Sequence, residues 1–544
     1  MSKRSRARAG AAATAAAVAL TGVAACGNHG GDSSNESDAA GTFGYQVSGD
    51  LLTTNAGSLE GSSTQAQVLS GRLYPGVYVP GPEGQTIPNT DLARAQELPG
   101  SERRVIYTLS QEAVFSDGTP VTCSDYLLAF TAGTNPEIFG SHMPLFDDAA
   151  NLACTPGSKE FTVVFKAGRG ARWKGLFTPG TVLPAHAVAA KLDMPIEQLD
   201  DNLVSGDESL LRPIADVWRH GFDLGSFDPD LQASFGPYKI DSVGPSGEVR
   251  LVANEFYYGD APSERELTVW PGSADTAELA ANGALRVGDL RDTTPDWFDP
   301  NAEDNRLEVQ SVVGELTEVL TFPQVGEWSL PENRVALSRC LDPRAVAAAS
   351  SSAAGVEVPV APYHVLRRND PMAARLDAAA DPHLDVDLDA ARAASGKQLR
   401  VGYAHPSERY AAMVESMRRS CEPAGITVVD ATRGGESATM ADLAHPTVDE
   451  FGQAGQTDGS VDAVVRAVDP LQEYPAALNR QQDFRVISAQ EAYLWNELPS
   501  IPLAAQPVSF AIDRNVGNVV PYTGLSGIGW NMNRWQLAGE NSAG

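Results

Sequence analysis

The chain has 544 residues, a mass of 57.5 kDa and a formal charge of −30. This length corresponds to about two to four structural units, and 42% hydrophobic with 20% charged residues is the composition of a folded protein. The acidic balance argues against a broad nucleic-acid footprint and against binding an anionic membrane through a basic patch, because both need basic surface.

The first 25 residues have the pattern of a secretory signal peptide. Four basic residues lie within residues 3–8, and residues 10–25 are small or apolar. This apolar run is shorter than the about 20 residues that a membrane-spanning helix needs. The sequence therefore predicts export of the protein, with residues 1–25 removed.

A cysteine follows the apolar run directly. The sequence VAAC (residues 23–26) resembles a bacterial lipobox, which implies cleavage before Cys26 and diacylation (palmitate) of its sulfur. The alternative is an ordinary signal peptide with an incidental cysteine. Residues 27–41 carry no large apolar side chain and predict a flexible tether after the lipidated Cys26. No other stretch reaches 18 consecutive apolar residues, so no further membrane span is expected.

The first half of the chain alternates strand and helix patterns. Strands are predicted where β-branched and aromatic residues alternate with polar ones, and helices where apolar spacing follows 3.6 residues. In order, we predict a strand at 103–109, a helix at 124–130 with Ser124 as N-cap, a strand at 159–167, loops with short helices over 209–235, a hairpin of 234–243 with 248–254, and a helix followed by a short strand over 273–290.

The second half continues the alternation. We predict strands at 315–323, 398–404, 426–432, 463–469 and 501–512, and helices at 331–349, 407–425 and 487–499. The strand–helix–strand order over 398–432 implies a right-handed α/β unit. The fold class is therefore α/β with mixed sheets and several lobes, and the lack of a regular repeat argues against a solenoid.

Patterns of catalysis and cofactor binding are missing from the sequence. It contains no GxxxxGK[ST], no GxGxxG after a strand, no HExxH and no GxSxG. No two of the eight histidines lie within five positions of each other, so the short-range pairs of zinc sites are absent. We expect no cofactor, no metal and no enzyme, with a site assembled from distant residues as the alternative.

Several segments of the chain, taken in order, match one known pattern. The most specific is YTLSQEAVFSDGTPVTCSDYLLAF (107–130), a strand, a DGTPVTA-type turn and a helix. The others are LYPGVYVPGPEGQTIPNTDLARAQEL (73–98), SFGPYKI (234–240), ELAANGALRVGDL (278–290), ENRVALSRCLDPRAV (332–346), the strand–helix–strand at 398–432 and YLWNELPSIPLAAQP (493–507). Together they resemble the family 5 extracellular solute-binding proteins, the peptide, nickel and glycoside receptors of ABC importers, over about residues 42–538.

This resemblance implies a two-lobed, type II periplasmic-binding-protein-like fold with an extra inserted domain. Lobe I would combine 42–72, 200–318 and 503–538, the inserted domain would be 73–199, and lobe II would be 319–502. A hinge is expected where the chain crosses between lobes, at Thr321–Phe322 and Ile501–Leu503. The ligand would lie between the lobes, which close on it through their differential affinity.

Four cysteines remain after Cys26 is set aside. An even number in an exported protein suggests two disulfides, and three pairings are possible. Cys123–Cys154 and Cys340–Cys421 are favoured, because each pair lies inside one predicted domain. The alternative is four buried thiols. Because no two of the four are closer than 31 positions, they form no metal-binding knuckle.

The resemblance also implies a place for the ligand. In the peptide receptors a lobe II carboxylate usually pairs with the α-amino group of the peptide. The matching stretch here is VDAVVRAVDPLQEYP (461–475), which keeps Asp469-Pro470 but lacks the family's aromatic residue and earlier Asp. Asp469 or Asp462 would receive an amine, whereas Arg466 would favour an anionic group. The alternatives are that Asp469 is a helix N-cap and that Arg466 is a surface or ion-pair residue.

Two aromatic residues are further candidates for the cleft. Phe322 lies in the sequence LTFP (320–323), where the family commonly has Asn after the aromatic residue, and Trp328 follows the strand that enters lobe II. Trp270, Trp495 and Trp530 lie within segments that match the family and are expected in the core.

The resemblance implies a monomeric, lipid-anchored receptor on the extracytoplasmic face of the cell membrane. It would capture a peptide or peptide-like small solute, deliver it to ABC permease subunits, and bind no nucleic acid. A second hypothesis is a degenerate solute-binding scaffold that acts as a cell-envelope regulator or interaction lipoprotein without transport. A hydrolytic enzyme is the third.

Overall fold

The computed structural model describes residues 43–81, 84–290, 297–303, 305–432, 437–448, 453–475 and 484–538. The predicted signal peptide, the lipobox cysteine Cys26 and the tether over 27–41 lie outside these residues and stay predictions. Within the described part of the chain, no helix has the length and apolar character that crossing a bilayer requires.

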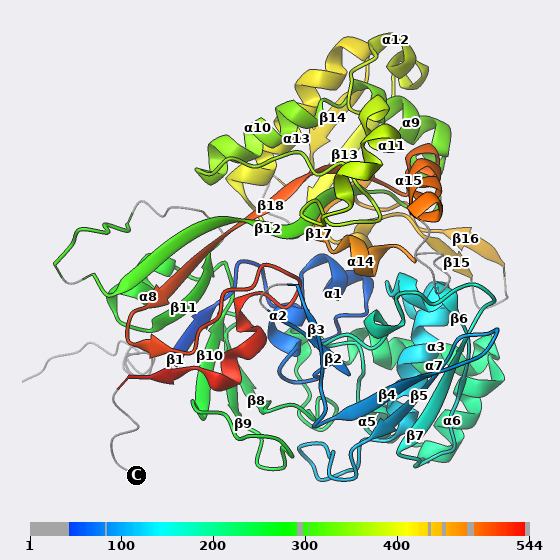
Figure 1. Cartoon of the computed structure of the whole chain (residues 1–544), viewed down its shortest axis with the longest axis vertical. Helices are drawn as coiled ribbons and strands as arrows, with labels where there is room; N and C mark the ends of the chain where they lie inside the picture. Colours follow the sequence, from blue (N-terminus) through cyan, green and yellow to red (C-terminus); the bar gives the residue numbers. More distant parts are fainter. Residues whose placement is uncertain are drawn as a thin grey trace, which may run out of the picture.

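A ten-stranded mixed sheet connects the two lobes (Figure 1). Its strands, in spatial order, are β14 (Thr427–Asp430), β13 (Gln398–Tyr403), β17 (Ala463–Val468), β12 (Leu307–Thr321), β18 (Ser500–Asp513), β11 (Leu285–Leu290), β1 (Phe43–Gln46), β10 (Glu266–Trp270), β9 (Val249–Ala253) and β8 (Tyr238–Val243). β13 runs parallel to β14 and β17, and β1 runs parallel to β10 and β11, whereas the other neighbours are antiparallel.

The two longest strands, β12 and β18, join the halves of this sheet. They pair in antiparallel fashion from Leu307 opposite Asp513 to Thr321 opposite Ser500. Their register shifts between Val313 and Thr317, and again between Glu318 and Val319. Such irregularities locally disrupt a ladder and bend the strand. The bend in β12 therefore lies a few residues before the predicted crossing at Thr321–Phe322. From Val319 to Thr321 the pairing of β12 with β18 is regular.

A second, four-stranded antiparallel sheet lies within the predicted inserted domain. Its strands are, in spatial order, β4 (Ala93–Leu98), β5 (Arg104–Leu109), β7 (Glu160–Phe165) and β6 (Ala149–Ala153). Short two-stranded ladders are formed by β2 (Tyr78–Pro80) with β3 (Thr86–Pro88), β15 (Pro446–Val448) with β16 (Ala454–Gln456), and β19 (Val516–Gly517) with β20 (Gln536–Leu537).

Helices accompany both sheets (Figure 1). Before β12 they are α1 (Leu59–Ser63), α2 (Gln67–Ser70), α3 (Cys123–Thr134), α4 (Pro136–Phe139), α5 (Ala185–Lys191), α6 (Ile196–Ser205), α7 (Glu208–His220) and α8 (Thr276–Ala281). After it they are α9 (Pro331–Cys340), α10 (Pro343–Ala354), α11 (Asp377–Ala380), α12 (Leu388–Ala391), α13 (Glu408–Cys421), α14 (Pro470–Glu473) and α15 (Phe484–Glu497).

Two large hydrophobic cores divide the molecule. The first is aromatic: Phe177 packs edge-on against the rings of Tyr107, Tyr126 and Phe161, and this core continues through the predicted inserted domain into β1, β8 and β9. The second consists mainly of Ala, Val, Leu and Met side chains under β12, β13 and β17. We call the parts built around these two cores the first lobe and the second lobe. The domain boundaries expected from the sequence stay a prediction.

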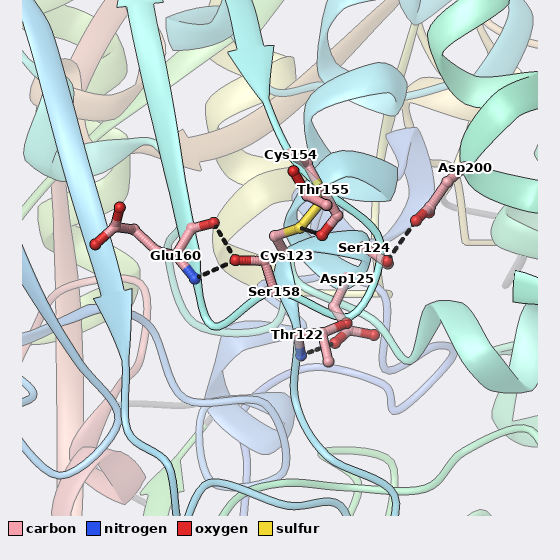
Figure 2. The surroundings of a disulfide bond; sticks show 9 residues. All are labelled: Thr122, Cys123, Ser124, Asp125, Cys154, Thr155, Ser158, Glu160 and Asp200. Carbon is pink, nitrogen blue, oxygen red and sulfur yellow. Dashed lines mark hydrogen bonds between the residues drawn. A yellow bond between two sulfur atoms is a disulfide. The ribbon is translucent and has the colours of Figure 1, made fainter. Parts of the chain in front are cut away.

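Each lobe contains one disulfide. Cys123 is bonded to Cys154 in the first lobe (Figure 2), and Cys340 is bonded to Cys421 in the second. The favoured pairing is thereby confirmed. Cys340 ends α9 and Cys421 ends α13, so the second disulfide ties together two helices of the second lobe.

Three predicted elements differ from the structure. The N-cap of α3 is Thr122 instead of Ser124, because the Asp125 carboxylate accepts a 2.8 Å hydrogen bond from the Thr122 N–H (Figure 2). The stretch 209–235 contains the 13-residue helix α7, which accommodates Pro213 in its interior. The predicted helix 331–349 is two helices, α9 and α10, since Asp342 caps a new helix before Pro343.

Candidate functional site

Three adjoining cavities lie at the junction of the lobes, and we call them A, B and C. Cavity C measures about 210 Å³, cavity A about 70 Å³ and cavity B about 40 Å³. Arg466 lines both A and B, and Asp469 lines both A and C. Because β17 of the second lobe ends between these two residues, the carboxyl end of β17 forms a wall shared by the whole crevice.

Asp469 holds two roles inside the protein. Its Oδ1 accepts from the Leu471 N–H at 3.0 Å, so it is the N-cap of α14. Its two oxygens also accept from Arg367 Nε (2.9 Å) and Nη2 (2.7 Å), a bidentate ion pair with Asp469 only 3% exposed. Arg367 Nη1 donates to Glu315 at 2.8 Å. Burial acts to lower the pKa of Arg367, but the carboxylates of Asp469 and Glu315 outweigh this effect, so the pKa is raised overall.

Arg466 lies in a second cluster on the other side of the same wall. It forms an ion pair with Glu473, and its Nε donates to the Thr321 hydroxyl at 3.1 Å. His142 of the first lobe lies 3.0 Å from Glu473 and 3.1 Å from Arg466 Nη2. Burial acts to raise the pKa of Glu473, but Arg466 and His142 outweigh it and hold that pKa at about 2. Glu473 is therefore ionised at neutral pH.

Arg172 bridges the two lobes. From the loop before Trp173 in the first lobe, its Nη1 donates to the carbonyls of Pro470 (2.7 Å) and Tyr474 (2.6 Å), and its Nη2 donates to the Val365 carbonyl. All three acceptors belong to the second lobe. Burial is the main cause that lowers the pKa of Arg172 to about 10, so the guanidinium stays charged at neutral pH.

A second contact between the lobes lies beside cavity B. The Met440 N–H of the second lobe donates to Ser63 Oγ of α1 at 2.9 Å. Glu60, also on α1, has its pKa raised to about 7 by burial and by the carboxylates of Asp223 and Asp442. Asp442 belongs to the second lobe, so two acidic groups from opposite lobes face each other at this contact.

Three predicted ligand residues lie apart from these cavities. Asp462 forms a fork with Arg400, at 2.8 Å to Nη2 and 3.0 Å to Nε. Trp328 is 2% exposed and donates its Nε1–H to the Gln398 carbonyl at 2.8 Å, and Phe322 is 6% exposed beneath the guanidinium of Arg334. None of the three lines cavities A, B or C, and the assignment of Asp462, Trp328 and Phe322 to a ligand stays a prediction.

The charged side chains of the crevice that no sequence pattern indicated include His142, Arg172, Lys174 and Arg367. They lie outside the longer helices and strands and far in sequence from Asp469, and no spacing pattern links them. Gln65 lines cavities A and B, and its backbone is left-handed (φ 56°). Its position between two short helices was a weak signal that could have indicated it. Among the described residues, no group of three metal-ligating side chains comes together.

The fold and the crevice define a class of protein, and comparison with known families supports it. The model of "Bacterial extracellular solute-binding proteins, family 5 Middle" matches residues 88–467. This is more than half of the chain, and the chain therefore belongs to that family of solute-binding proteins.

One relative and two solved structures extend the comparison. An "uncharacterized lipoprotein" of Mycobacterium tuberculosis is 29% identical over 571 aligned residues, which cover 96% of each chain. The periplasmic EDTA-binding protein EppA superposes with a TM-score of 0.64 at 17% identity, over 92% of this chain and 97% of that one. The oligopeptide-binding protein AppA of Bacillus subtilis, in complex with a nonapeptide, gives 0.61 at 14% identity, over 92% and 99%. These two structures confirm the two-lobed fold.

Proposed function

We propose that the protein is a non-enzymatic receptor that binds a peptide or peptide-like solute between its lobes and passes it, chemically unaltered, to the permease of an ABC importer. The observation that carries this proposal is the crevice of cavities A, B and C, whose walls come from both lobes. Strands β12 and β18 run from one lobe into the other, so a ligand in the crevice would bias their relative position.

The proposed receptor is anchored by lipid on Cys26 at the extracytoplasmic face of the membrane and acts as a monomer. The lipobox-like sequence and the lipoprotein name of the mycobacterial relative support the anchor. The nonapeptide bound to AppA supports a peptide-like ligand, because AppA shares the two-lobed fold. Of the ligand residues expected from the sequence, Arg466 and Asp469 are the two that line the crevice.

Native mass spectrometry of the protein purified without denaturation tests this function. A receptor retains part of its solute, so we expect a mass in excess of the chain and its lipid, which disappears after unfolding and refolding. The released compound is then identified by fragmentation. An unchanged mass before and after refolding, together with no binding from a peptide library, would contradict the receptor function.

A second candidate function is favoured by one specific observation. Asp469 and Arg466, the charged residues expected to meet a ligand, are engaged by Arg367 and Glu473 within the protein. A scaffold that no longer transports a solute, and instead acts in the cell envelope through its outer surface, would retain such pairs. A protein that binds no solute in the experiment above but captures an envelope partner would support this alternative.

A further inference from the structure

We propose that the crevice, in the receptor role proposed above, selects an anionic solute: a carboxylate of a compact ligand binds Arg172 and Lys174 in cavity C, and Asp469 receives no amine. This inference deepens the proposed function, since it names the charge class of the ligand and the two side chains that recognise it. It reverses the expectation that an acidic residue of the second lobe would meet an α-amino group.

The hydrogen-bonding capacity of Asp469 is already used within the protein. Arg367 donates to both of its oxygens, and the N-terminus of α14 donates to Oδ1 as well. Gln472 Nε2 also donates to Asp469 Oδ2, at 3.4 Å. An incoming ammonium group would have to displace a buried bidentate arginine, whose charge would then remain without its partner. Asp469 therefore stabilises the wall of the cavity and does not offer a free negative charge.

Arg172 is a partly buried cation with no carboxylate of the described residues within ion-pair distance. Its three hydrogen bonds all go to backbone carbonyls, and no ion pair joins it to another described residue. A guanidinium has five N–H donors, so its Nε and one N–H of Nη2 have no acceptor among the described residues. Buried charges in proteins are normally paired. A carboxylate in cavity C would supply both the missing charge and the missing acceptors.

Lys174 lies two positions further along, in the short 3-10 helix Trp173–Gly175, and its side chain is exposed. Its ammonium lies 5.5 Å from the ring centre of Tyr78 and 5.7 Å from that of Trp173, and no acidic residue of the described chain forms an ion pair with it. The two rings hold the ammonium at the edge of cavity C without neutralising it. Arg172 and Lys174 thus present two cations from one short segment.

The charge of cavity C contrasts with that of the chain. The chain carries a formal charge of −30, yet among the described residues Arg172, Lys174 and Arg367 line this cavity together with one carboxylate, that of Asp469. Even when Glu315, the other partner of Arg367, is included, one positive charge remains in excess. An acidic surface repels anions at long range, so a locally basic cavity provides short-range selection. The size of about 210 Å³ suits a compact ligand.

Isothermal titration calorimetry with matched probes tests the inference. The mature chain with both disulfides, refolded to remove any retained solute, is titrated with N-acetyl-trialanine, trialanine and trialanine amide, which share one backbone and carry charges of −1, 0 and +1. Citrate serves as an anion without a peptide backbone. We expect N-acetyl-trialanine to bind about tenfold more tightly than the amide, because an ion pair replaces a like-charge contact.

Two variants locate the effect. Lys174→Gln is expected to weaken N-acetyl-trialanine about fivefold and to leave the amide unchanged or slightly tighter, since one cation is lost. Lys191→Gln removes a cation from the same lobe, where Lys191 pairs with Asp228 outside the cavity, and is expected to change neither affinity. Arg172→Gln is not needed for the decision, because Arg172 also bridges the lobes.

The outcomes separate the inference from the proposed function. If the amide binds as tightly as the acetylated peptide, or if Lys174→Gln and Lys191→Gln act alike, the anion site is wrong while the receptor stands. If citrate binds and no peptide does, the anion site stands and the peptide-like ligand is wrong. If none of the four probes binds at millimolar concentration, the anion site is contradicted, and native mass spectrometry with the peptide library decides the receptor function separately.

Discussion

One buried acid of the first lobe and two of the second lobe are accommodated differently. In the first lobe, Asp289 on β11 is 4% exposed, and its Oδ1 has no hydrogen-bond partner among the residues that the structure describes; burial raises its pKa to about 7. In the second lobe, Glu318 and Glu491 are fully buried, but Glu318 pairs with Arg409 and Glu491 pairs with His364 at 2.9 Å. The first lobe thus keeps an acid that prefers to be neutral, whereas the second balances each of these two acids with a base.

The two arrangements make the stability of the lobes sensitive to different changes. A neutral buried acid makes stability depend on pH, since deprotonation leaves an uncompensated charge. A buried pair makes stability depend on the presence of both partners, since removal of one leaves the other without compensation. A different substitution is therefore needed in each lobe to test this contrast.

The largest expected effect is in the second lobe. Arg409→Met removes the partner of Glu318, to which Arg409 Nη1 donates at 2.8 Å, and should lower the free energy of unfolding by about 3–5 kcal/mol. Urea unfolding followed by circular dichroism measures the change. Arg418→Met on the same helix, α13, is the control, because Arg418 is exposed and pairs with Glu415 at the surface. Equal losses for both variants would contradict the role of the buried pair.

The next effect is in the first lobe and depends on pH. Because the folded pKa of Asp289 is about 7 and its unfolded pKa about 3.9, the folded state binds the proton more tightly, and stability falls as pH rises from 4 to 7. Asp289→Asn should remove this loss. Its free energy of unfolding should equal that of the unsubstituted protein near pH 4 and exceed it by about 4 kcal/mol at pH 8. Denaturant unfolding at a series of pH values measures it. The exposed Asp241→Asn is the control, and a gain independent of pH would contradict the prediction.

The pattern of the sequence predicted most of the fold but not these partnerships. The alternation over 398–432 predicted β13, α13 and β14, because period and capping are local properties. Helix α7 was missed because the interior Pro213 and the surrounding acidic residues favour a loop. The bond between Arg367 and Asp469 joins residues 102 positions apart, and nothing local to either residue reveals it. The sequence therefore indicated Arg466 and Asp469, which line the crevice, but not their partners within the protein, and the role of both residues in ligand binding stays a prediction.

A smaller effect sharpens the comparison at the junction. Arg172→Met removes three hydrogen bonds to the second lobe, and because Arg172 is only partly buried and water can replace some of these bonds, the contact between the lobes should weaken by about 1.5–3 kcal/mol in total. Small-angle X-ray scattering should show a larger radius of gyration. Arg169→Met changes an exposed arginine three positions earlier and serves as the control. An unchanged radius for Arg172→Met would show that other contacts hold the lobes together.

The smallest effect joins both lobes. Glu60 faces Asp223 and Asp442 and has a pKa of about 7, so its protonation below pH 7 removes repulsion across the junction. Closing should strengthen as pH falls from 8 to 6, by no more than about 1 kcal/mol because the contact is partly solvated. Glu60→Gln should abolish this dependence, whereas Glu112→Gln at an exposed position should not. Small-angle X-ray scattering at pH 8 and pH 6 measures this change. A pH dependence that remains in Glu60→Gln would contradict the role of Glu60.

The most direct measurement for the central claim is a crystal structure of the protein grown with N-acetyl-trialanine. We expect electron density for the peptide in the crevice between the lobes, with its carboxylate within hydrogen-bond distance of Arg172 and Lys174. Intact peptide is expected, since no group is proposed to attack it. An empty crevice at saturating peptide, or density for cleaved fragments, would contradict a receptor that holds its solute without chemistry.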